Sequence, residues 1–241
     1  MDGKKFMDNR FFDMAVHDMR APLSGIIGYS EAILDGTISG EKQRLNAVRV
    51  ISDEAKRLSG LIDMTLDFSR FENFCKSEKF KIFDILDVIR KTLVNFDISF
   101  SKKNLFVKTN FKDDDHIFAF GNENAISRVI QNLVDNAVKF SFDGGTVEVS
   151  ADISGKNKVN ICIYNTGLGI KDEDLPDIQR IFSRGELPDK KIDGYGIGLY
   201  IVSTILKKHG SFLEIDSQEN KFCKMSFSLD RTSQDKTSSD F

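Results

Sequence analysis

The chain has 241 residues, a formal net charge of −3 at pH 7, 40% hydrophobic residues and 29% charged residues. This composition is typical of a soluble globular protein with one large or two small domains. The small net charge excludes a general attraction to nucleic acid or to acidic membranes, so we expect no nucleic-acid partner. No apolar run is long enough to span a bilayer, and the polar N-terminus is unlike a signal peptide. The three cysteines have no metal-ligand spacing, which favours reduced thiols in a cytosolic setting.

The first third of the chain predicts two long helices. In the first, apolar residues alternate in steps of four and three, at Phe12, Val16, Met19, Leu23, Ile26 and Ile33, with Ser30 in register. Gly36 predicts where this helix stops. The second pattern comprises Leu45, Val48, Ile51, Ala55, Leu58, Ile62 and Leu66. Two such helices form a hairpin with one apolar stripe half covered, and a second copy would complete a four-helix bundle in a homodimer.

Beyond residue 75 short strands and helices alternate. The pattern predicts a strand followed by a helix over 79–96, a helix over 122–140 with Asn122 as its N-cap, and a helix that stops at Gly210. Further strands are predicted over 104–111, 145–153, 158–165, 212–217 and 221–229. We therefore predict an all-α helical hairpin followed by an α+β two-layer sandwich. The predicted domains are 1–75 and 76–230, with a disordered polar tail over 231–241.

The helix over 126–139 has two chemically different faces. One face is apolar and comprises Ile126, Val129, Ile130, Leu133, Val134, Ala137 and Val138. The opposite face carries Asn132, Asp135, Asn136 and Lys139. A solvated polar face is the ordinary interpretation of such a helix. Two asparagines spaced by four residues with a lysine also suit a hydrated Mg²⁺ ion and phosphate.

Two glycine clusters follow this helix. Asn165, Gly167 and Gly169 come directly after a predicted strand, and Gly194, Gly196 and Gly198 come directly before a predicted helix. Glycines let a backbone approach a ligand closely, and a helix N-terminus favours phosphate. Each cluster alone is weak evidence, and the Gly194 cluster fits neither a dinucleotide fingerprint nor a P-loop.

The order of these motifs over residues 80–230 resembles the ATP-binding domain of sensor histidine kinases, which shares its fold with gyrase, Hsp90 and MutL. The resemblance implies that Asn132 and Asn136 hold Mg²⁺ and phosphates, with Lys139 beside them. It assigns Gly167 and Gly169 to the adenine side and Gly194, Gly196 and Gly198 to the triphosphate. Residues 183–193 would form a lid, in which Arg184, Lys190 and Lys191 could neutralise phosphate charge.

Two positions depart from the family pattern. The acid that accepts a hydrogen bond from the adenine amino group is replaced by Asn165, whose amide oxygen can still accept that bond without charge assistance. We therefore expect weaker nucleotide binding. Gly185 replaces the second aromatic residue of the family's F-box, which we interpret as a variant of the lid.

The segment "HDMRAPLSGIIGY", which starts at His17, resembles the phospho-acceptor H-box of the same kinases. The resemblance makes His17 the nucleophile that attacks ATP and Asp18 the group that orients or deprotonates it. Pro22 removes the backbone hydrogen bond to the Asp18 carbonyl, which weakens the helix one turn after His17. Ala21 stands where many relatives have Thr or Asn to position water, so we expect weak phosphatase activity.

The leading hypothesis is a homodimeric, ATP-dependent histidine kinase that passes phosphate from His17 to an aspartate in a response regulator receiver domain. A pseudokinase scaffold without efficient turnover is the main alternative, and an ATPase of the gyrase or Hsp90 type is the third. Because no sensor domain precedes the H-box, we expect a cytoplasmic core of a longer protein, which can include a membrane anchor.

Overall fold

The computed structural model describes residues 2–77, 79–155, 157–178 and 198–232, with side chains left out at 2–14, 63–64 and 67–77. The chain divides into two compact units, Met1–Asn73 and Phe74–Phe241. The first is helical and the second contains a mixed sheet with helices, so the predicted fold class is confirmed. None of the described helices is long and apolar enough to cross a membrane.

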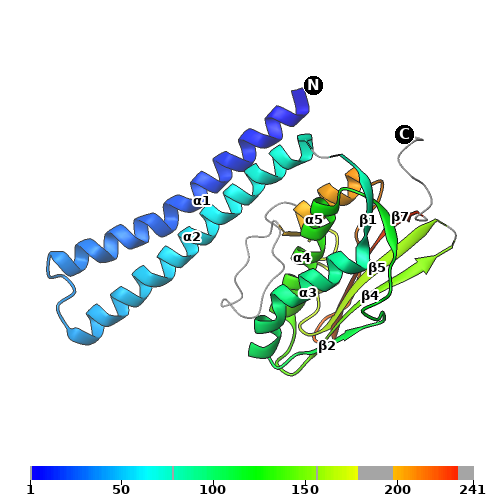
Figure 1. The fold of residues 1–241 in the computed structure, drawn as a ribbon. Helices are drawn as coiled ribbons and strands as arrows, with labels where there is room; N and C mark the ends of the chain where they lie inside the picture. The colour runs from blue at the N-terminus through cyan, green and yellow to red at the C-terminus, as the bar shows by residue number, and fades with distance from the viewer. Residues whose placement is uncertain (1, 78, 156, 179–197, 233–241) are drawn as a thin grey trace. The chain divides into compact units, whose positions relative to one another are not determined.

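The first unit is an antiparallel helical hairpin (Figure 1). Helix α1 (Asp2–Leu34) and helix α2 (Glu41–Ser77) are joined by residues 35–40, and Gly36 has a positive φ of 81° just beyond α1. Ala15, Ala47 and Leu61 are buried within the hairpin.

The apolar residues of α1 lie on two faces, where the sequence pattern predicted one seam. Ala15 and Pro22 are buried, whereas Val16 and Leu23 remain exposed. Among the described side chains of the hairpin, the exposed large aliphatic ones are Val16, Leu23, Ile27, Leu34, Leu45, Val48, Ile62 and Leu66. The predicted half-covered stripe is therefore present, and it runs along both helices.

The second unit is built on a seven-stranded sheet in the order β1-β3-β7-β5-β4-β2, with β6 also paired to β7. The strands are β1 (Lys81–Asp84), β2 (Phe106–Thr109), β3 (Phe118–Gly121), β4 (Thr146–Ser154), β5 (Lys158–Thr166), β6 (Glu214–Gln218) and β7 (Phe222–Arg231). The β2–β4 pair is parallel and the other pairs are antiparallel. Strand β3 was not predicted, because its four residues follow a polar loop and are too short to show a clear alternation.

Three helices cover one face of this sheet: α3 (Ile85–Lys102), α4 (Glu123–Phe140) and α5 (Gly198–Lys208) (Figure 1). Along β5 buried residues alternate with partly exposed ones, as expected for a sheet with one covered face. Helix α4 packs between α3 and α5 and against β5. Its buried residues include all seven that the sequence predicted for its apolar face.

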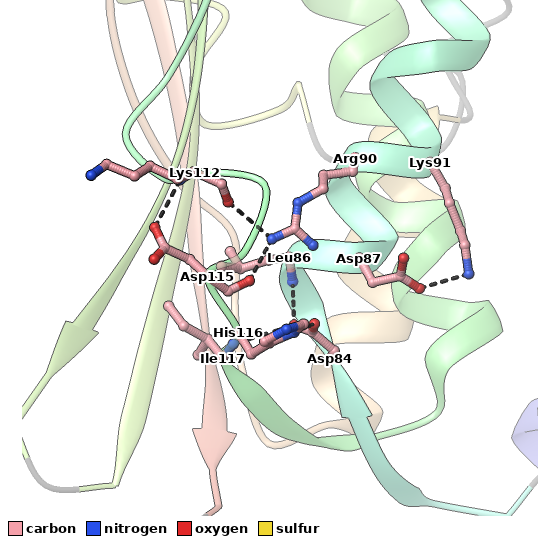
Figure 2. A network of polar contacts seen from close by, with 9 residues as sticks. All are labelled: Asp84, Leu86, Asp87, Arg90, Lys91, Lys112, Asp115, His116 and Ile117. Carbon is pink, nitrogen blue, oxygen red and sulfur yellow. Dashed lines mark hydrogen bonds and ion pairs between the residues drawn. The ribbon is translucent and has the colours of Figure 1, made fainter.

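The N-terminal ends of α3 and α4 have the caps that the backbone requires. The side chain of Asn122 accepts a hydrogen bond from the Ala125 N–H at 3.0 Å, which confirms the predicted N-cap of α4. Asp84 caps α3 by accepting from the Leu86 N–H at 3.0 Å. Asp84 also lies 2.7 Å from Nδ1 of His116, so His116 has a partner and is not simply a solvated loop residue (Figure 2).

Arg90 of α3 connects the loop before β3 to this helix. Its guanidinium donates hydrogen bonds to the carbonyl oxygens of Lys112 and Asp115 (Figure 2). The same group lies 5.8 Å from the centre of the Phe111 ring. The polar contacts of Asp84 and Arg90 therefore attach the loop before β3 to the N-terminal part of α3.

The C-terminal end of α4 also has partners for its last four carbonyl groups, which a helix alone leaves unsatisfied. The ammonium of Lys103 donates to the carbonyl oxygens of Val138 and Lys139 at 3.0 and 2.8 Å. The Ser141 N–H donates to the Ala137 carbonyl at 3.1 Å, and the Leu168 N–H to the Phe140 carbonyl at 3.0 Å. The partners come from the C-cap residues of α3 and α4 and from the loop after β5.

His209 connects α5 to the start of α4. Its Nε2 accepts a hydrogen bond from the Asn122 N–H at 3.0 Å, and its Nδ1–H donates to the Ile205 carbonyl at 2.9 Å. Phe80 stacks on the imidazole ring with 4.6 Å between ring centres. Burial lowers the pKa of His209 below its ordinary value of 6.5, and the neighbouring Lys208 adds to the effect. The native structure therefore requires the neutral imidazole, because a proton on Nε2 would face the Asn122 N–H.

We expect acid to destabilise the native protein in part through His209. The pKa of His209 is lower in the folded state than in the unfolded state. The contribution of neutral His209 to the free energy of unfolding is therefore complete above about pH 6.5, and it is lost as pH falls through the folded-state pKa. The loss has a slope of at most about 1.4 kcal/mol per pH unit for one proton. Urea unfolding at several pH values should show a steeper acid loss for the wild type than for His209→Gln, which keeps an acceptor but cannot titrate. Equal slopes would contradict this role.

Candidate active site

The first candidate site residue, His17, lies on an accessible part of α1. Its side chain is 81% exposed and that of Asp18 is 45% exposed. Nδ1 of His17 lies 3.3 Å from Oδ1 of Asp18. With the proton on Nδ1, the carboxylate can accept it, and the lone pair on Nε2 is left for a reaction partner. The structure thus gives His17 the accessibility and the orienting neighbour that a nucleophilic imidazole needs.

Two H-box residues one turn after His17, Ala21 and Pro22, differ in their exposure to solvent. Pro22 is buried, and α1 continues through it to Leu34. Ala21 is exposed and lies four residues after His17, so both are on the same face of the helix. The side chain of Ala21 is a methyl group, which offers no hydrogen bond to a water molecule near the imidazole.

The polar residues of α4 gather on the face opposite its buried face. Asn132, Asn136 and Lys139 are all partly exposed there. The Nδ2 of Asn132 donates to the Arg128 carbonyl at 2.9 Å, and this bond fixes the orientation of the amide. The Oδ1 of Asn132 lies 3.1 Å from the position that a Cβ would take at Gly198, the first residue of α5.

This contact brings together two motifs that are far apart in the sequence. The amide oxygen of Asn132 lies beside the N-terminus of α5, the end of a helix that favours an anion. Nearby, the ammonium of Lys139 lies 2.6 Å from Oδ2 of Asp135, and both side chains are partly exposed. Exposed ion pairs of this kind contribute little stability, so Lys139 can exchange its partner for phosphate.

The loop after β5 is held by hydrogen bonds at Gly167 and Leu168. The Gly167 N–H donates to the Lys221 carbonyl at 3.1 Å, and the Asn220 N–H donates to the Leu168 carbonyl at 2.7 Å. A Cβ at Gly167 would collide with the Phe140 carbonyl, and one at Gly169 with the Gln218 carbonyl. Gly169 also has a positive φ of 63°. Both glycines are therefore required by close approach to neighbouring backbone.

Ser217 is a positioning residue that the sequence analysis did not identify. Its hydroxyl accepts a hydrogen bond from the Ile170 N–H at 2.8 Å and donates to the Phe222 carbonyl at 2.8 Å. It thereby fixes the end of the glycine loop to the β6–β7 hairpin. Ser217 lies 47 residues from Ile170 in the sequence, and no local pattern indicates the pairing.

Asn165 is the last buried residue of β5 before this loop. It is 4% exposed, and its cross-strand neighbour on β7 is Cys223. Burial raises the pKa of the Cys223 thiol to about 11, so this cysteine is an inert packing residue. Cys162 and Cys223 are both free thiols, as predicted.

Several predicted site residues lie outside the described residues. They are Arg184, Lys190 and Lys191 of the predicted lid, with Gly185, and the first two glycines of the second cluster, Gly194 and Gly196. The structure brings together Asn132 and Gly198. Separately, it places Gly167 against the end of α4 and Gly169 against the β6–β7 hairpin.

Comparison with known proteins gives a family for each unit. Residues 7–74 match the His Kinase A (phospho-acceptor) domain, and residues 121–233 match the Histidine kinase-, DNA gyrase B-, and HSP90-like ATPase family. His17 lies in the first match and the candidate nucleotide-binding residues lie in the second. The chain therefore contains the two domains of a histidine kinase catalytic core.

Individual relatives agree with this assignment. Drug sensory protein A of Synechocystis sp. is 30% identical over 220 residues, which are 87% of this chain and 33% of that protein. Histidine protein kinase SaeS of Staphylococcus epidermidis is 29% identical over 207 residues, which are 83% of this chain and 57% of that protein. The chain thus spans a third to little more than half of these two relatives.

Solved structures also share the fold. The crystal structure of histidine kinase ThkA in complex with the response regulator protein TrrA has 22% sequence identity to this chain and a TM-score of 0.65. The similarity covers 94% of this chain and 63% of that chain.

We expect Gly167→Ala to weaken both the fold and nucleotide binding. The new methyl group would collide with the Phe140 backbone, and overpacking of this kind costs about 1–3 kcal/mol of unfolding free energy. Because the glycine loop would be displaced from α4, the affinity for ATP should fall as well. Urea unfolding and calorimetric titration with Mg²⁺-ATP measure the two effects. Gly28→Ala is the control, because nothing lies within 4 Å of its new methyl group; equal behaviour of the two variants would contradict the prediction.

Proposed function

We propose that this chain is the catalytic core of a two-component histidine kinase that phosphorylates itself on His17 from Mg²⁺-ATP and then passes the phosphoryl group to an aspartate of a response regulator. The observation that carries the proposal is an exposed imidazole paired with a carboxylate, in a chain whose two units match the phospho-acceptor and ATPase families. The first match gives the His17 hairpin a role that a gyrase-type or Hsp90-type ATPase would not need.

In the first step, Nε2 of His17 attacks the γ-phosphorus of ATP. The new N–P bond forms as the bond to the β–γ bridging oxygen breaks, and ADP leaves. Asp18 accepts the Nδ1 proton as positive charge develops on the ring. In the second step, a carboxylate oxygen of the receiver domain attacks the phosphorus, and His17 leaves as a neutral imidazole after the proton returns to it.

Asn132 and Asn136 would hold Mg²⁺ together with the phosphate oxygens. Their amide oxygens are hard, neutral ligands on one face of α4, and that of Asn132 is already oriented toward the start of α5. Within the described part of the chain, no group of three or more His, Cys, Asp or Glu side chains is placed to hold a metal. The bound ion would offset the charge of the triphosphate. We propose that Lys139, Gly198 and, from the predicted lid and second glycine cluster, Arg184, Lys190, Gly194 and Gly196 bind the phosphates.

We propose that the active form is a homodimer. The exposed apolar stripe along α1 and α2 is the surface that a second hairpin would cover in a four-helix bundle. His17 is adjacent to Val16 of this stripe in sequence but about 100° from it around the helix, so the dimer would leave the imidazole accessible. A receiver domain as partner is supported by ThkA, which is similar to this chain over both units and binds a response regulator. Free thiols and the need for ATP favour the cytoplasm as the location.

Incubation with γ-labelled ATP and Mg²⁺ tests the proposed reaction. The protein should acquire a label that is lost in acid and kept in alkali, and His17→Gln should abolish it. Asp18→Asn should slow labelling by about 10²-fold or more while nucleotide binding is kept, because the proton acceptor is removed. Nucleotide binding without labelling would support the scaffold alternative, and release of free phosphate without labelling would support a gyrase-type ATPase.

We also propose that the phosphatase activity toward the response regulator is weak. A threonine at position 21 would present a hydroxyl to water on the His17 face of α1, so Ala21→Thr should accelerate dephosphorylation of the regulator by about fivefold to thirtyfold. Phosphate release from a receiver domain phosphorylated by the kinase itself is the measurement. Ala21→Val, which has the shape of threonine without the hydroxyl, should show no such gain. Rapid dephosphorylation by the wild type would refute the proposal.

A further inference from the structure

The side chain of Lys103 lies at the C-terminal end of helix α4. Lys103 is the C-cap residue of α3 and is partly buried. Its ammonium donates hydrogen bonds to the carbonyl oxygens of Val138 at 3.0 Å, Lys139 at 2.8 Å and Ser141 at 3.0 Å. An ammonium has three N–H donors, so all of them are used by backbone carbonyls. The side chain is therefore a fixed connection between the ends of two helices.

The backbone around Lys103 is held as well. The Lys103 carbonyl accepts a hydrogen bond from the Gly144 N–H at 2.8 Å, in the turn that connects α4 to β4. The next N–H along the chain, that of Asn104, donates to the Ser101 carbonyl at 3.1 Å. Because both the backbone and the ammonium are bonded, Lys103 holds the end of α4 in one position relative to α3.

Two of the last four carbonyl groups of α4 accept hydrogen bonds from this ammonium. The four belong to Ala137, Val138, Lys139 and Phe140. The first accepts from the Ser141 N–H and the last from the Leu168 N–H, whereas the two between them accept from Lys103. Without the ammonium these two carbonyls would lose a charged donor, and the last turn of the helix would be free to fray.

The same turn of α4 carries two side chains of the proposed phosphate site. The Lys139 carbonyl accepts from Lys103, while the ammonium of Lys139 lies on the polar face of the helix beside Asp135. Asn136 lies three residues before Lys139 and therefore on the same face. If this turn frayed, both side chains would have to be ordered when a nucleotide binds, and that ordering would lower the affinity.

We propose that Lys103 is a positioning residue for the nucleotide site, which holds the last turn of α4 in the conformation that binds Mg²⁺-ATP. Lys103 acts through the helix, because all three N–H donors of its ammonium are engaged by backbone carbonyls. The inference rests on the proposed function, in which Asn136 and Lys139 bind Mg²⁺ and phosphate. It adds to that function a residue that lies on another element and outside the sequence motifs.

Calorimetric titration of the full chain with Mg²⁺-ATP, well below the unfolding temperature, tests this inference. Lys103→Met keeps most of the side-chain length but removes the ammonium, and its dissociation constant should rise by about tenfold. Lys102→Met is the matched control, because it removes the same charge from an exposed neighbour, and its dissociation constant should stay within about twofold of the wild type. A residue that only stabilised the fold would not change the affinity of the folded molecules.

The rate of His17 labelling from γ-labelled ATP provides a second readout. In Lys103→Met, KM for ATP should rise by about tenfold while kcat stays within about threefold, because saturating nucleotide restores the order of the turn. Lys103→Arg keeps the charge and N–H donors but has a planar group, which fits three converging carbonyls less well. It should recover most of the lost affinity, to within about threefold of the wild type.

The outcomes separate this inference from the proposed function. A folded Lys103→Met variant with the wild-type dissociation constant would overturn the inference and leave the kinase assignment intact. An equal loss in Lys102→Met, no recovery in Lys103→Arg, or a fall in kcat at unchanged KM would overturn it too. If the wild type neither binds ATP nor labels His17, the proposed function is wrong and the inference is wrong with it.

A milder variant keeps the test decisive if Lys103→Met does not fold. Lys103→Gln retains two N–H donors without the charge, so it can satisfy part of the carbonyl set. Its dissociation constant for Mg²⁺-ATP should be about threefold or more above that of the wild type. An unchanged dissociation constant in this variant would overturn the inference.

Discussion

The carbonyl groups at the C-terminal end of α4 impose the main constraint on the second unit. A helix cannot satisfy its last four carbonyls, and here Lys103, the C-cap residue of α3, and the backbone of the loop after β5 supply hydrogen bonds. The bond from Leu168 to Phe140 requires the loop to approach the helix so closely that residue 167 has no room for a side chain. The same bond therefore closes the helix and positions the glycine loop of the candidate nucleotide site.

Helix α4 also contacts α5, both at its start and in its middle. At its start, the Asn122 N–H is bonded to His209 of α5, and in its middle the amide of Asn132 lies beside the first residue of α5. Because its apolar face is buried between two helices and the sheet, the polar face cannot rotate away from these contacts. Packing energy thus fixes the orientation of the asparagines that we propose for Mg²⁺ and phosphate.

Helix α1 of the hairpin exposes two different features on two of its faces, the His17 imidazole and part of the apolar stripe. In the proposed function, the imidazole of His17 is reached first by a nucleotide and then by an acceptor protein, so it has to be exposed. The apolar stripe that we propose contacts a second hairpin must also be exposed in a single chain. His17 and Val16 meet these requirements as sequence neighbours, because the helical turn of about 100° per residue points their side chains in different directions.

The sequence alone determined the features that depend on local periodicity and local hydrogen bonding. These include the two long helices, the buried face of α4, the Asn122 cap and the glycine at which α5 ends. The order of the motifs was sufficient to indicate the histidine kinase family, because each motif combines a residue type with a fixed place between strand and helix. The proposed roles of Asn132, Asn136 and Lys139 also came from this order.

The tertiary structure alone decided which of the apolar residues of α1 are buried, because the heptad pattern does not distinguish the partner within the hairpin from a second copy. It also revealed strand β3, the hydrogen bonds that require a neutral imidazole at His209, and the hydrogen bonds of Lys103 and Ser217. Each of these depends on residues that are distant in the sequence or on an element too short to show a period. Such contacts become visible only when the sheet and its helices have brought the partners together.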